Sequence, residues 1–184
     1  MELVSKLDLS GQSPVDKHFE GIHFSACNFA NANLSSCKFI DCCFSDCDLS
    51  MAQLRQASFQ DVTFKGCKLL GLQFDKCSAF ALSFSFENCL MDHVVFFKVK
   101  LSGTRFTNCR IQEADFTDAI ADKVTFEKCD LASTVFERTS LLMADFRTAW
   151  NYAIDPELNK LKGARFSEAG LRGLLLKYKL NIES

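Results

Sequence analysis

Ten cysteines and three histidines are the residues of this 184-residue chain that could bind a metal, form disulfides or act as nucleophiles. Six of the cysteines recur every twenty residues, in two series: Cys27, Cys47 and Cys67, then Cys89, Cys109 and Cys129. Zinc ligands usually come in pairs two to four residues apart, and no phosphate-binding loop accompanies the cysteines. A spacing of twenty indicates a repeated architecture, and this architecture decides where each thiol lies.

The repeat has a period of five residues. From Phe19 to Phe84 every fifth residue is Phe or Leu, except Ala79, and from Phe86 to Phe146 the series resumes with Phe, Leu, Met, Ile and Ala. This period matches neither the 3.6 of a helix nor the 2 of a strand. It fits a chain that turns a corner every five residues, so that four sides close one coil. Successive coils then stack as parallel strands about 4.8 Å apart.

A second inward position precedes each large residue by two. It is mostly Cys, Ala, Val or Thr, whereas the other three positions of each repeat are largely polar. One large and one small side chain per side fill a narrow tube without voids. The sequence therefore predicts an all-β solenoid of quadrilateral cross-section.

The same phase assigns the cysteines to the core. Nine of the ten occupy the small inward position, and only Cys43 is expected at the surface. We therefore expect reduced, buried thiols that form neither disulfides nor a metal site. His18, His23 and His93 fall at outward positions with no ligand partner at a recognisable spacing. The sequence predicts no enzymatic activity, no catalytic residue, no cofactor and no metal.

Three stretches carry the motif Ala-Asp/Asn-Leu/Phe followed by two variable residues: 32–36, 114–118 and 144–148. In this motif the chain resembles the pentapeptide repeat proteins, over about residues 17–148. The resemblance implies a right-handed quadrilateral β-solenoid. Fold alone does not give function, which has to be argued from the surface.

Three segments are predicted: an N-terminal cap over 1–16, the solenoid over 17–148, and an irregular last coil with a C-terminal helix over 149–184. The phase shifts by two residues near 84–86. We expect one bulged corner there and an offset between the coils on either side. Phe80 and Phe97 fall outside the ladder, either as local packing or as an apolar spot that faces a partner.

The C-terminal segment predicts a short capping helix that begins after Ser167. Its apolar residues recur at helical spacing, with one residue off the stripe and one in the segment that follows. The candidate cap or dimer residues are Leu171, Leu174, Leu175, Leu176, Tyr178 and Ile182. Two alternatives stay open: a purely intramolecular cap, or a cap that also forms a symmetric dimer contact.

The tail extends the resemblance. Ile154-Asp155-Pro156, residues 161–166 and the Leu-rich helix look like the ending of Qnr/MfpA-type quinolone-resistance proteins. This resemblance implies a homodimer through the C-terminal end and a type II topoisomerase partner, DNA gyrase or topoisomerase IV. That group imitates duplex DNA and relieves fluoroquinolone poisoning. The present chain departs from the group in lacking its long inserted loops; only the two-residue jump near 84–86 is present.

Imitation of DNA requires about one negative charge per 1.7 Å. Residues 17–148 hold 16 acidic and 14 basic residues, a net charge of −2, which argues against a strongly acidic rod. Two segments are locally acidic and form the candidate partner-binding surface: Asp41, Asp46, Asp48 and Asp61, then Glu113, Asp115, Asp118 and Asp122. The alternative is that they are solvated acids on a mixed surface.

Charge and hydropathy patterning disfavour other function classes. With a formal net charge of −2 and no basic stripe with interleaved aromatics, we expect no direct nucleic-acid binding. No secretory signal pattern and no run of about 18 apolar residues is seen, so the expectation is a cytoplasmic protein that does not enter a membrane. The leading hypothesis is a non-catalytic, possible DNA-mimicking binder of gyrase or topoisomerase IV. The alternative is a generic protein-interaction scaffold with an unknown partner.

Overall fold

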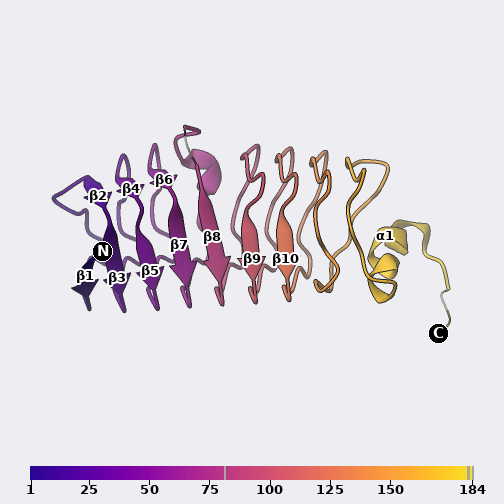
Figure 1. The fold of residues 1–184 in the computed structure, drawn as a ribbon, viewed down its shortest axis with the longest axis horizontal. Helices are drawn as coiled ribbons and strands as arrows, with labels where there is room; N and C mark the ends of the chain where they lie inside the picture. The colour runs from indigo at the N-terminus through magenta and orange to yellow at the C-terminus, as the bar shows by residue number, and fades with distance from the viewer. Residues whose placement is uncertain (81, 182, 184) are drawn as a thin grey trace.

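The computed structural model describes residues 1–80, 82–181 and 183, and it is a β-solenoid (Figure 1). Its coils lie side by side along the long axis, with the N-terminus at one end and helix α1 (Arg172–Leu175) at the other. The predicted fold class is confirmed: an all-β, right-handed quadrilateral solenoid with a short C-terminal helix.

Two of the four sides form regular parallel sheets, one of seven strands and one of three. The first has the order β1 (Glu2–Ser5), β3 (Ile22–Ser25), β5 (Cys43–Ser45), β7 (Val62–Lys65), β8 (Phe84–Glu87), β9 (Arg105–Thr107) and β10 (Thr125–Glu127). The second has the order β2 (His18–Glu20), β4 (Lys38–Ile40) and β6 (Ser58–Gln60). Isolated parallel bridges hold the remaining sides together.

We number the four faces in chain order. Face 1 is the seven-stranded sheet, face 2 contains the bridge Asn28↔Asp48, and face 3 contains the bridge Val95↔Asp115. Face 4 contains the three-stranded sheet and, further along, the column of bridges that includes Ile120. Because each coil visits the faces in turn, face 1 lies opposite face 3, and face 2 lies opposite face 4.

The core consists of stacked aromatic columns. On face 1 the ring centroids of Phe24, Phe44 and Phe64 are 4.8 and 5.1 Å apart, and the column continues through Phe86 and Phe106 at 5.3 and 5.0 Å. These spacings are close to the distance between neighbouring strands, so each ring fills its own coil and touches the next. Each buried Phe stabilises the fold by about 1.5–3 kcal/mol. The inward position predicted for these rings is confirmed.

The corners use left-handed backbone. The second residue after a central position has positive φ, as at Asp41 (49°), Asp61 (52°) and Asp118 (57°). Such a conformation costs an ordinary residue about 1–2 kcal/mol. Hydrogen bonds between coils offset that cost; the Asp41 N–H, for example, donates to the Gln60 carbonyl at 2.9 Å.

The Asp or Asn of the repeat motif bends the chain toward the corner. The side-chain oxygens of Asp48 and Asp115 accept hydrogen bonds from the N–H groups two residues on, at 2.9 and 2.8 Å. This local bond is an Asx turn, which favours a change of chain direction. The polar residue of the motif therefore has a structural role before it can have a binding role.

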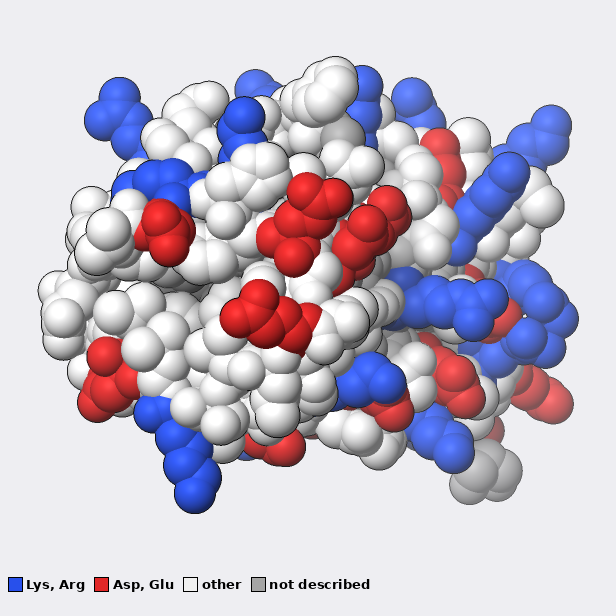
Figure 2. Space-filling model, turned by 60° about the vertical axis from the view of Figure 1, so that its left-hand side comes forward, with Lys and Arg blue, Asp and Glu red and all other residues white. Residues whose placement is uncertain are grey.

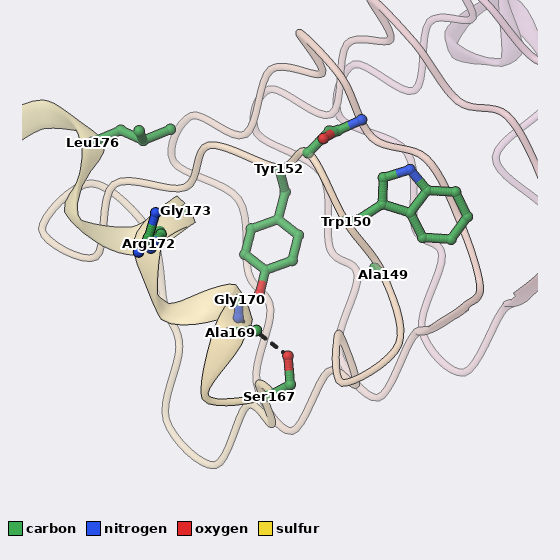
Figure 3. Close-up of a pocket in the computed structure, with 10 residues that line it drawn as sticks. Ala149, Trp150, Tyr152, Ser167, Ala169, Gly170, Arg172, Gly173 and Leu176 are labelled. Atoms are coloured by element: carbon green, nitrogen blue, oxygen red, sulfur yellow. Dashed lines mark hydrogen bonds between the residues drawn. The ribbon is translucent and has the colours of Figure 1, made fainter. Parts of the chain in front are cut away.

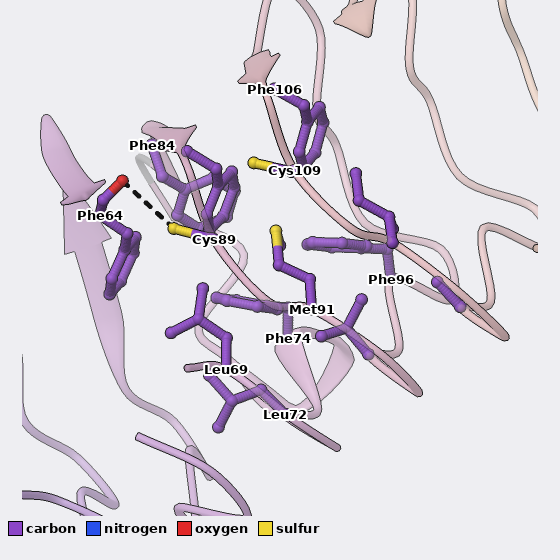
Figure 4. Close-up of a cluster of buried hydrophobic side chains, with 14 of the residues drawn as sticks. Phe64, Leu69, Leu72, Phe74, Phe84, Cys89, Met91, Phe96, Phe106 and Cys109 are labelled. Atoms are coloured by element: carbon purple, nitrogen blue, oxygen red, sulfur yellow. Dashed lines mark hydrogen bonds between the residues drawn. The ribbon is translucent and has the colours of Figure 1, made fainter. Parts of the chain in front are cut away.

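The two cysteine series join into one column along the inner wall of face 2. Each thiol donates to backbone carbonyls, as Cys47 Sγ does to Phe24 O at 3.5 Å and Cys89 Sγ to Phe64 O at 3.4 Å (Figure 4). All ten cysteines are unbridged and eight are buried, which confirms most of the prediction. Cys43 and Cys77 are half-buried, so Cys77 was wrongly predicted to be fully inside.

The two additional residues of the phase shift lie in a loop between the 3₁₀ turn η1 (Phe74–Lys76) and β8. Face 1 continues across the loop, because Val62 pairs with Phe84 and Phe64 pairs with Phe86. The predicted offset between coils is therefore wrong on this face. Phe84 fills the small inward position of its coil, and Ala79, predicted to be central, is exposed.

The phase shift interrupts the ladder of bridges on face 3. Gln53 is bridged to Asn33 and Gln73 to Val95, but no bridge joins Gln53 to Gln73 in the part of the chain that the structure describes. A cavity of about 590 Å³ opens between these two coils, lined by both glutamines, Arg55 and Asp75.

The two ends of the tube are closed differently. At the N-terminus Met1 and Leu3 are exposed at the edge formed by β1. At the C-terminus the buried Tyr152 plugs the tube, with its ring centroid 5.5 Å from that of Phe146. The turns η2 (Ala169–Leu171) and η3 (Leu176–Tyr178) flank α1 over this end. Among the described residues, no helix has the length and apolar character needed to cross a membrane.

Candidate protein-interaction surfaces

Three of the first four candidate acids border face 1. Asp41 and Asp61 occupy equivalent corners of consecutive coils, and Asp46 occupies the corner just beyond β5. All three are exposed. Asp61 accepts a hydrogen bond from Ser83 Oγ at 2.9 Å. None of the three forms a salt bridge with a described residue. They are therefore available to a partner.

Asp48, the fourth member, lies on face 2 and is half-buried. One of its oxygens holds the Asx turn at Ser50, and the other lies 3.9 Å from Lys68 Nζ. Its charge is therefore partly compensated within the protein.

The second acidic group lies on the other side of the tube. Asp115 is on face 3, Glu113 and Asp118 occupy the corners that bound it, and Asp122 is on face 4. Because face 3 is opposite face 1, the structure does not bring the two groups together. One continuous acidic surface from both is therefore not formed.

Internal contacts occupy most of the second group. Arg138 Nε donates to Asp118 Oδ1 at 2.7 Å, and this hydrogen bond lowers the pKa of the Asp118 carboxyl. Glu113 lies 3.5 Å from His93 Nδ1. Asp122 accepts hydrogen bonds from Ser140 Oγ and the Leu142 N–H at 2.6 and 3.1 Å.

The charged exterior is mixed. In the view of Figure 2, acidic side chains are grouped near the centre of the face, and basic side chains lie around and among them. This distribution agrees with the formal net charge of −2. A partner that recognises this protein by charge must therefore contact a small cluster of charged side chains, because the described surface carries both signs of charge.

The C-terminal cap is helical, as expected, but only four residues are α-helical. Leu174 packs against the core, Leu175 is half-buried, and Leu171, Leu176 and Tyr178 are 45, 59 and 48% exposed. A 3₁₀ turn has three residues per turn, so the flanking turns remove Leu171 and Tyr178 from the face of Leu174. No strand is assigned to Leu180 and Asn181, and Ile182 lies outside the described residues.

A lysine clamp attaches the cap to the last coil. Lys177 Nζ lies 2.7 Å from Asp155 Oδ1 and 2.6 Å from Glu157 Oε2, and Tyr178 Oη donates to Glu157 at 2.8 Å. The hydrogen bonds from Lys177 lower the pKa of both carboxyls. Desolvation works against the charge of Lys177, but the two carboxylates outweigh it and raise the pKa of this lysine.

A pocket of about 520 Å³ separates the last coil from the cap (Figure 3). Trp150 lines one side, and Tyr152 points from the coil toward Gly170. A Cβ on Gly170 would clash with Tyr152 Oη, and one on Gly173 would clash with the Tyr152 carbonyl oxygen. These two glycines therefore let the cap approach the tyrosine.

Sequence reasoning missed two residues of this end. Asn159 is buried; its Oδ1 accepts from the Thr139 N–H, and its Nδ2 donates to the Phe136 and Asp155 carbonyls, each at 2.9 Å. The signal was present, because Asn159 stands two residues before Leu161, at a small inward position. Tyr152 gave no such signal, since it lies outside the five-residue phase.

The histidines lie on the exterior, and two of them, His23 and His93, contact a neighbouring coil. His23 Nε2 lies 2.9 Å from Ser45 Oγ, one coil away on face 1. Over residues 1–80, 82–181 and 183, no group of three or more His, Cys, Asp or Glu side chains is placed to hold a metal ion.

The repeat pattern has a counterpart among known families. A family model described as a pentapeptide repeat region matches residues 17–84 and 57–136. No curated protein sequence matches the chain significantly.

Solved structures with a similar fold include QnrB1, described as a plasmid-mediated fluoroquinolone resistance protein. Its trypsin-treated variant aligns with a TM-score of 0.56 at 21% identity over 99% of this chain and 100% of the other. Full-length QnrB1 gives 0.55 at 20% identity over 97 and 100%. HetL, from the cyanobacterium Nostoc, gives 0.40 at 16% identity over 90 and 83%. At these identities the likeness concerns the fold.

Proposed function

Because this chain belongs to the pentapeptide repeat family, we propose that it is a non-catalytic, protein-binding solenoid whose partner is DNA gyrase or topoisomerase IV. The observation that carries the proposal is the filled tube. Phe44, Phe64 and Phe106 are completely buried and the inner wall is apolar, so recognition falls to the exterior. A cytoplasmic location belongs to the same proposal, because these enzymes act on chromosomal DNA.

The likeness to QnrB1 supports this choice of partner, because that protein is described as conferring fluoroquinolone resistance. We place the contact on the first half of face 1, at Asp41, Asp46 and Asp61. Their carboxylates border the parallel sheet of face 1, at corners that repeat at about the strand spacing of 4.8 Å. They supply fewer charges than a duplex of the same length, so the imitation of DNA is local.

We further propose that two copies associate through the C-terminal end. Leu176, Tyr178 and Leu180 are all roughly half-exposed there, and Trp150 is 47% exposed at the edge of the adjoining pocket. A symmetric contact would bury this apolar group twice over. Light scattering tests this association on the full chain and on a chain that ends near Ser167. If both chains contain the same number of copies per particle, the proposed contact is rejected.

Supercoiling by gyrase, with and without a fluoroquinolone, tests the main proposal. The wild-type protein at micromolar concentration should inhibit the enzyme or protect it from the drug. Replacing Asp41, Asp46 and Asp61 together by Asn should weaken that effect. The matched control replaces Glu113 by Gln and Asp115 and Asp122 by Asn, and it should leave the effect unchanged. If the wild-type protein neither inhibits nor protects, the topoisomerase proposal has to be dropped.

The second candidate function is an interaction scaffold for a different protein. The mixed charge of the surface favours it, because the acidic groups are small and separated (Figure 2). Under this alternative both triple variants behave alike with gyrase.

A further inference from the structure

The phase shift leaves a small apolar cavity at the corner between faces 3 and 4. Its volume is about 140 Å³, and Phe74, Cys77, Leu82 and Phe97 provide its apolar lining. A cavity of about 150 Å³ with apolar walls is large enough to bind benzene. The cavity can therefore accept one apolar side chain.

Phe80 is adjacent in sequence to the lining of this cavity. It follows Ala79, which lines the cavity, and it is 83% exposed. The Phe residues of the ladder face the core, whereas Phe80 lies outside the ladder and is exposed to a partner. An exposed aromatic ring beside an apolar cavity marks an interaction site more strongly than an isolated surface residue does.

Two lysines flank the same cavity. Lys98 and Lys100 both line it, and neither forms a salt bridge with a residue that the structure describes. Lys98 Nζ lies 4.8 Å from the centroid of the Phe97 ring, which holds the ammonium group beside the opening. The rim is therefore positively charged.

Asp75 lies at the boundary between this cavity and the larger one on face 3. Its side chain is only 9% exposed; Oδ2 lies 2.7 Å from Lys76 Nζ, and Oδ1 has no hydrogen-bond partner. A buried acceptor without a donor costs about 1–3 kcal/mol. Oδ1 would therefore gain from an N–H donor of a ligand.

We propose that this corner binds an extended acidic segment of a partner protein. One apolar side chain fills the cavity against Phe74 and Phe97, the exposed Phe80 covers it from outside, and the flanking carboxylates lie beside Lys98 and Lys100. A backbone N–H of the segment meets Asp75, and the chain continues into the cavity of about 590 Å³ on face 3. The N–H donor and the anionic flanks together describe a peptide; a nucleic acid supplies the anions, but its backbone has no N–H.

The inference rests on the proposed protein-binding function and is independent of whether the partner is a topoisomerase. None of the residues that line the cavity belongs to the acids proposed for gyrase, although Asp61 accepts a hydrogen bond from Ser83, which follows the lining residue Leu82. The two proposals are therefore separated by their variants.

Fluorescence anisotropy with a labelled peptide tests the inference. The probe has a single Leu flanked on each side by two Asp residues. We expect it to bind the wild-type full-length protein more tightly than three other probes. These are the peptide with Ala for Leu, the peptide with Lys for Asp, and a labelled single-stranded oligonucleotide. Binding should weaken as salt is raised, because exposed charges are screened.

Two variants and one matched control locate the site. Lys98→Glu with Lys100→Glu should weaken binding by at least about tenfold, and so should Phe80→Ser. Position 98 is a left-handed corner, and Asp118 occupies the equivalent corner of the next coil, so an acidic side chain is compatible with this backbone. The control is Lys160→Glu with Lys162→Glu, the same change of charge farther along the tube, which should leave binding unchanged.

Three results would overturn the inference. The acidic peptide fails to bind at millimolar concentration, or the control weakens binding as much as the test variant does, or the oligonucleotide binds more tightly than the peptide. The supercoiling assay with the same variants keeps the two proposals apart. Lost peptide binding with an intact effect on gyrase removes only this inference, and the reverse removes only the topoisomerase partner.

Discussion

The coil around β5 and the coil interrupted at η1 are built from the same five-residue unit, yet they present different surfaces. Around β5 the large side chains point inward, and the ladder pairs on both sides, with β3 and β7. At η1 the ladder on face 3 is open, Phe80 is exposed and Asp75 Oδ1 has no partner. Two additional residues therefore change a coil whose backbone and apolar side chains are paired within the protein into one that leaves such groups unpaired.

The cap at the C-terminal end is a second region where the repeat is interrupted. There the period also fails, and Tyr152, Asn159 and Lys177 replace the repeat with individual contacts. Regular coils supply stability through identical neighbours, whereas irregular segments supply the distinct surfaces. The irregular segments therefore add distinct surfaces to the acidic corners that the regular coils around β5 present.

The largest expected effect contrasts two phenylalanines. Phe64→Ala should reduce the free energy of unfolding by about 3–5 kcal/mol, because Phe64 is completely buried between stacked rings. Phe80→Ala should change it by less than about 0.5 kcal/mol, because Phe80 is 83% exposed. Urea denaturation followed by circular dichroism measures both. Equal losses would show that the interrupted coil is as well packed as the regular one.

A somewhat smaller effect is expected at Asn159. Asn159→Ala should cost about 3 kcal/mol, because it leaves the Thr139 N–H and two carbonyls without their partner. Asn108→Gly is the control, since the Asn108 side chain donates to Asn88 at the exposed surface and glycine adopts the left-handed φ of 58° at this corner without strain; it should cost less than about 0.5 kcal/mol. A negligible loss at Asn159 would mean that water satisfies the end of the tube equally well.

Next comes the close approach of the cap. Gly173→Ala should cost about 2 kcal/mol, because the added Cβ would lie 2.6 Å from Tyr152 Cδ2. The Ile154 N–H donates to the Gly173 carbonyl at 3.0 Å, so its hydrogen exchange should accelerate while exchange in β5 stays slow. Faster exchange in both places would argue that the cap and the tube unfold together.

The smallest effect concerns pH. The pKa values of Asp155 and Glu157 are lowered by the hydrogen bonds from Lys177, so these carboxyls stabilise the docked cap above their unfolded pKa values, near 4. That contribution is lost as pH falls through the lower folded values. Trp150, the only tryptophan, lines the pocket beside the cap and reports the change by fluorescence.

Lys177→Met is the control for this titration. It removes the partner of both carboxyls, so the fluorescence change between pH 5 and pH 2 should diminish. A titration identical to that of the wild-type protein would show that the fluorescence change at low pH does not depend on Lys177.

The sequence alone was sufficient to predict the features that recur in every repeat. The period of five predicted the tube, the inward Phe columns and the buried cysteines. The same pattern recurs in every coil, so a deviation at one position does not obscure it. It was insufficient at the phase shift. Phe84 was assigned to a central position, whereas it pairs with Val62 at a small one. A spacing cannot say which corner takes up two additional residues.

The acidic candidates divide in the same way. Their outward position follows from the phase, but their separation onto opposite faces follows from the number of sides per coil. Whether a carboxylate is available to a partner depended on neighbours twenty residues away, as for Asp118 and Arg138.

By itself the sequence determined a four-sided tube with a packed apolar lumen, because a strict period leaves a single way to bury a large side chain every five residues. Only the tertiary structure decided which acids are paired, where the ladder opens and how the cap closes the end. Those outcomes depend on contacts between coils, and a local pattern along the chain does not encode the distances across them.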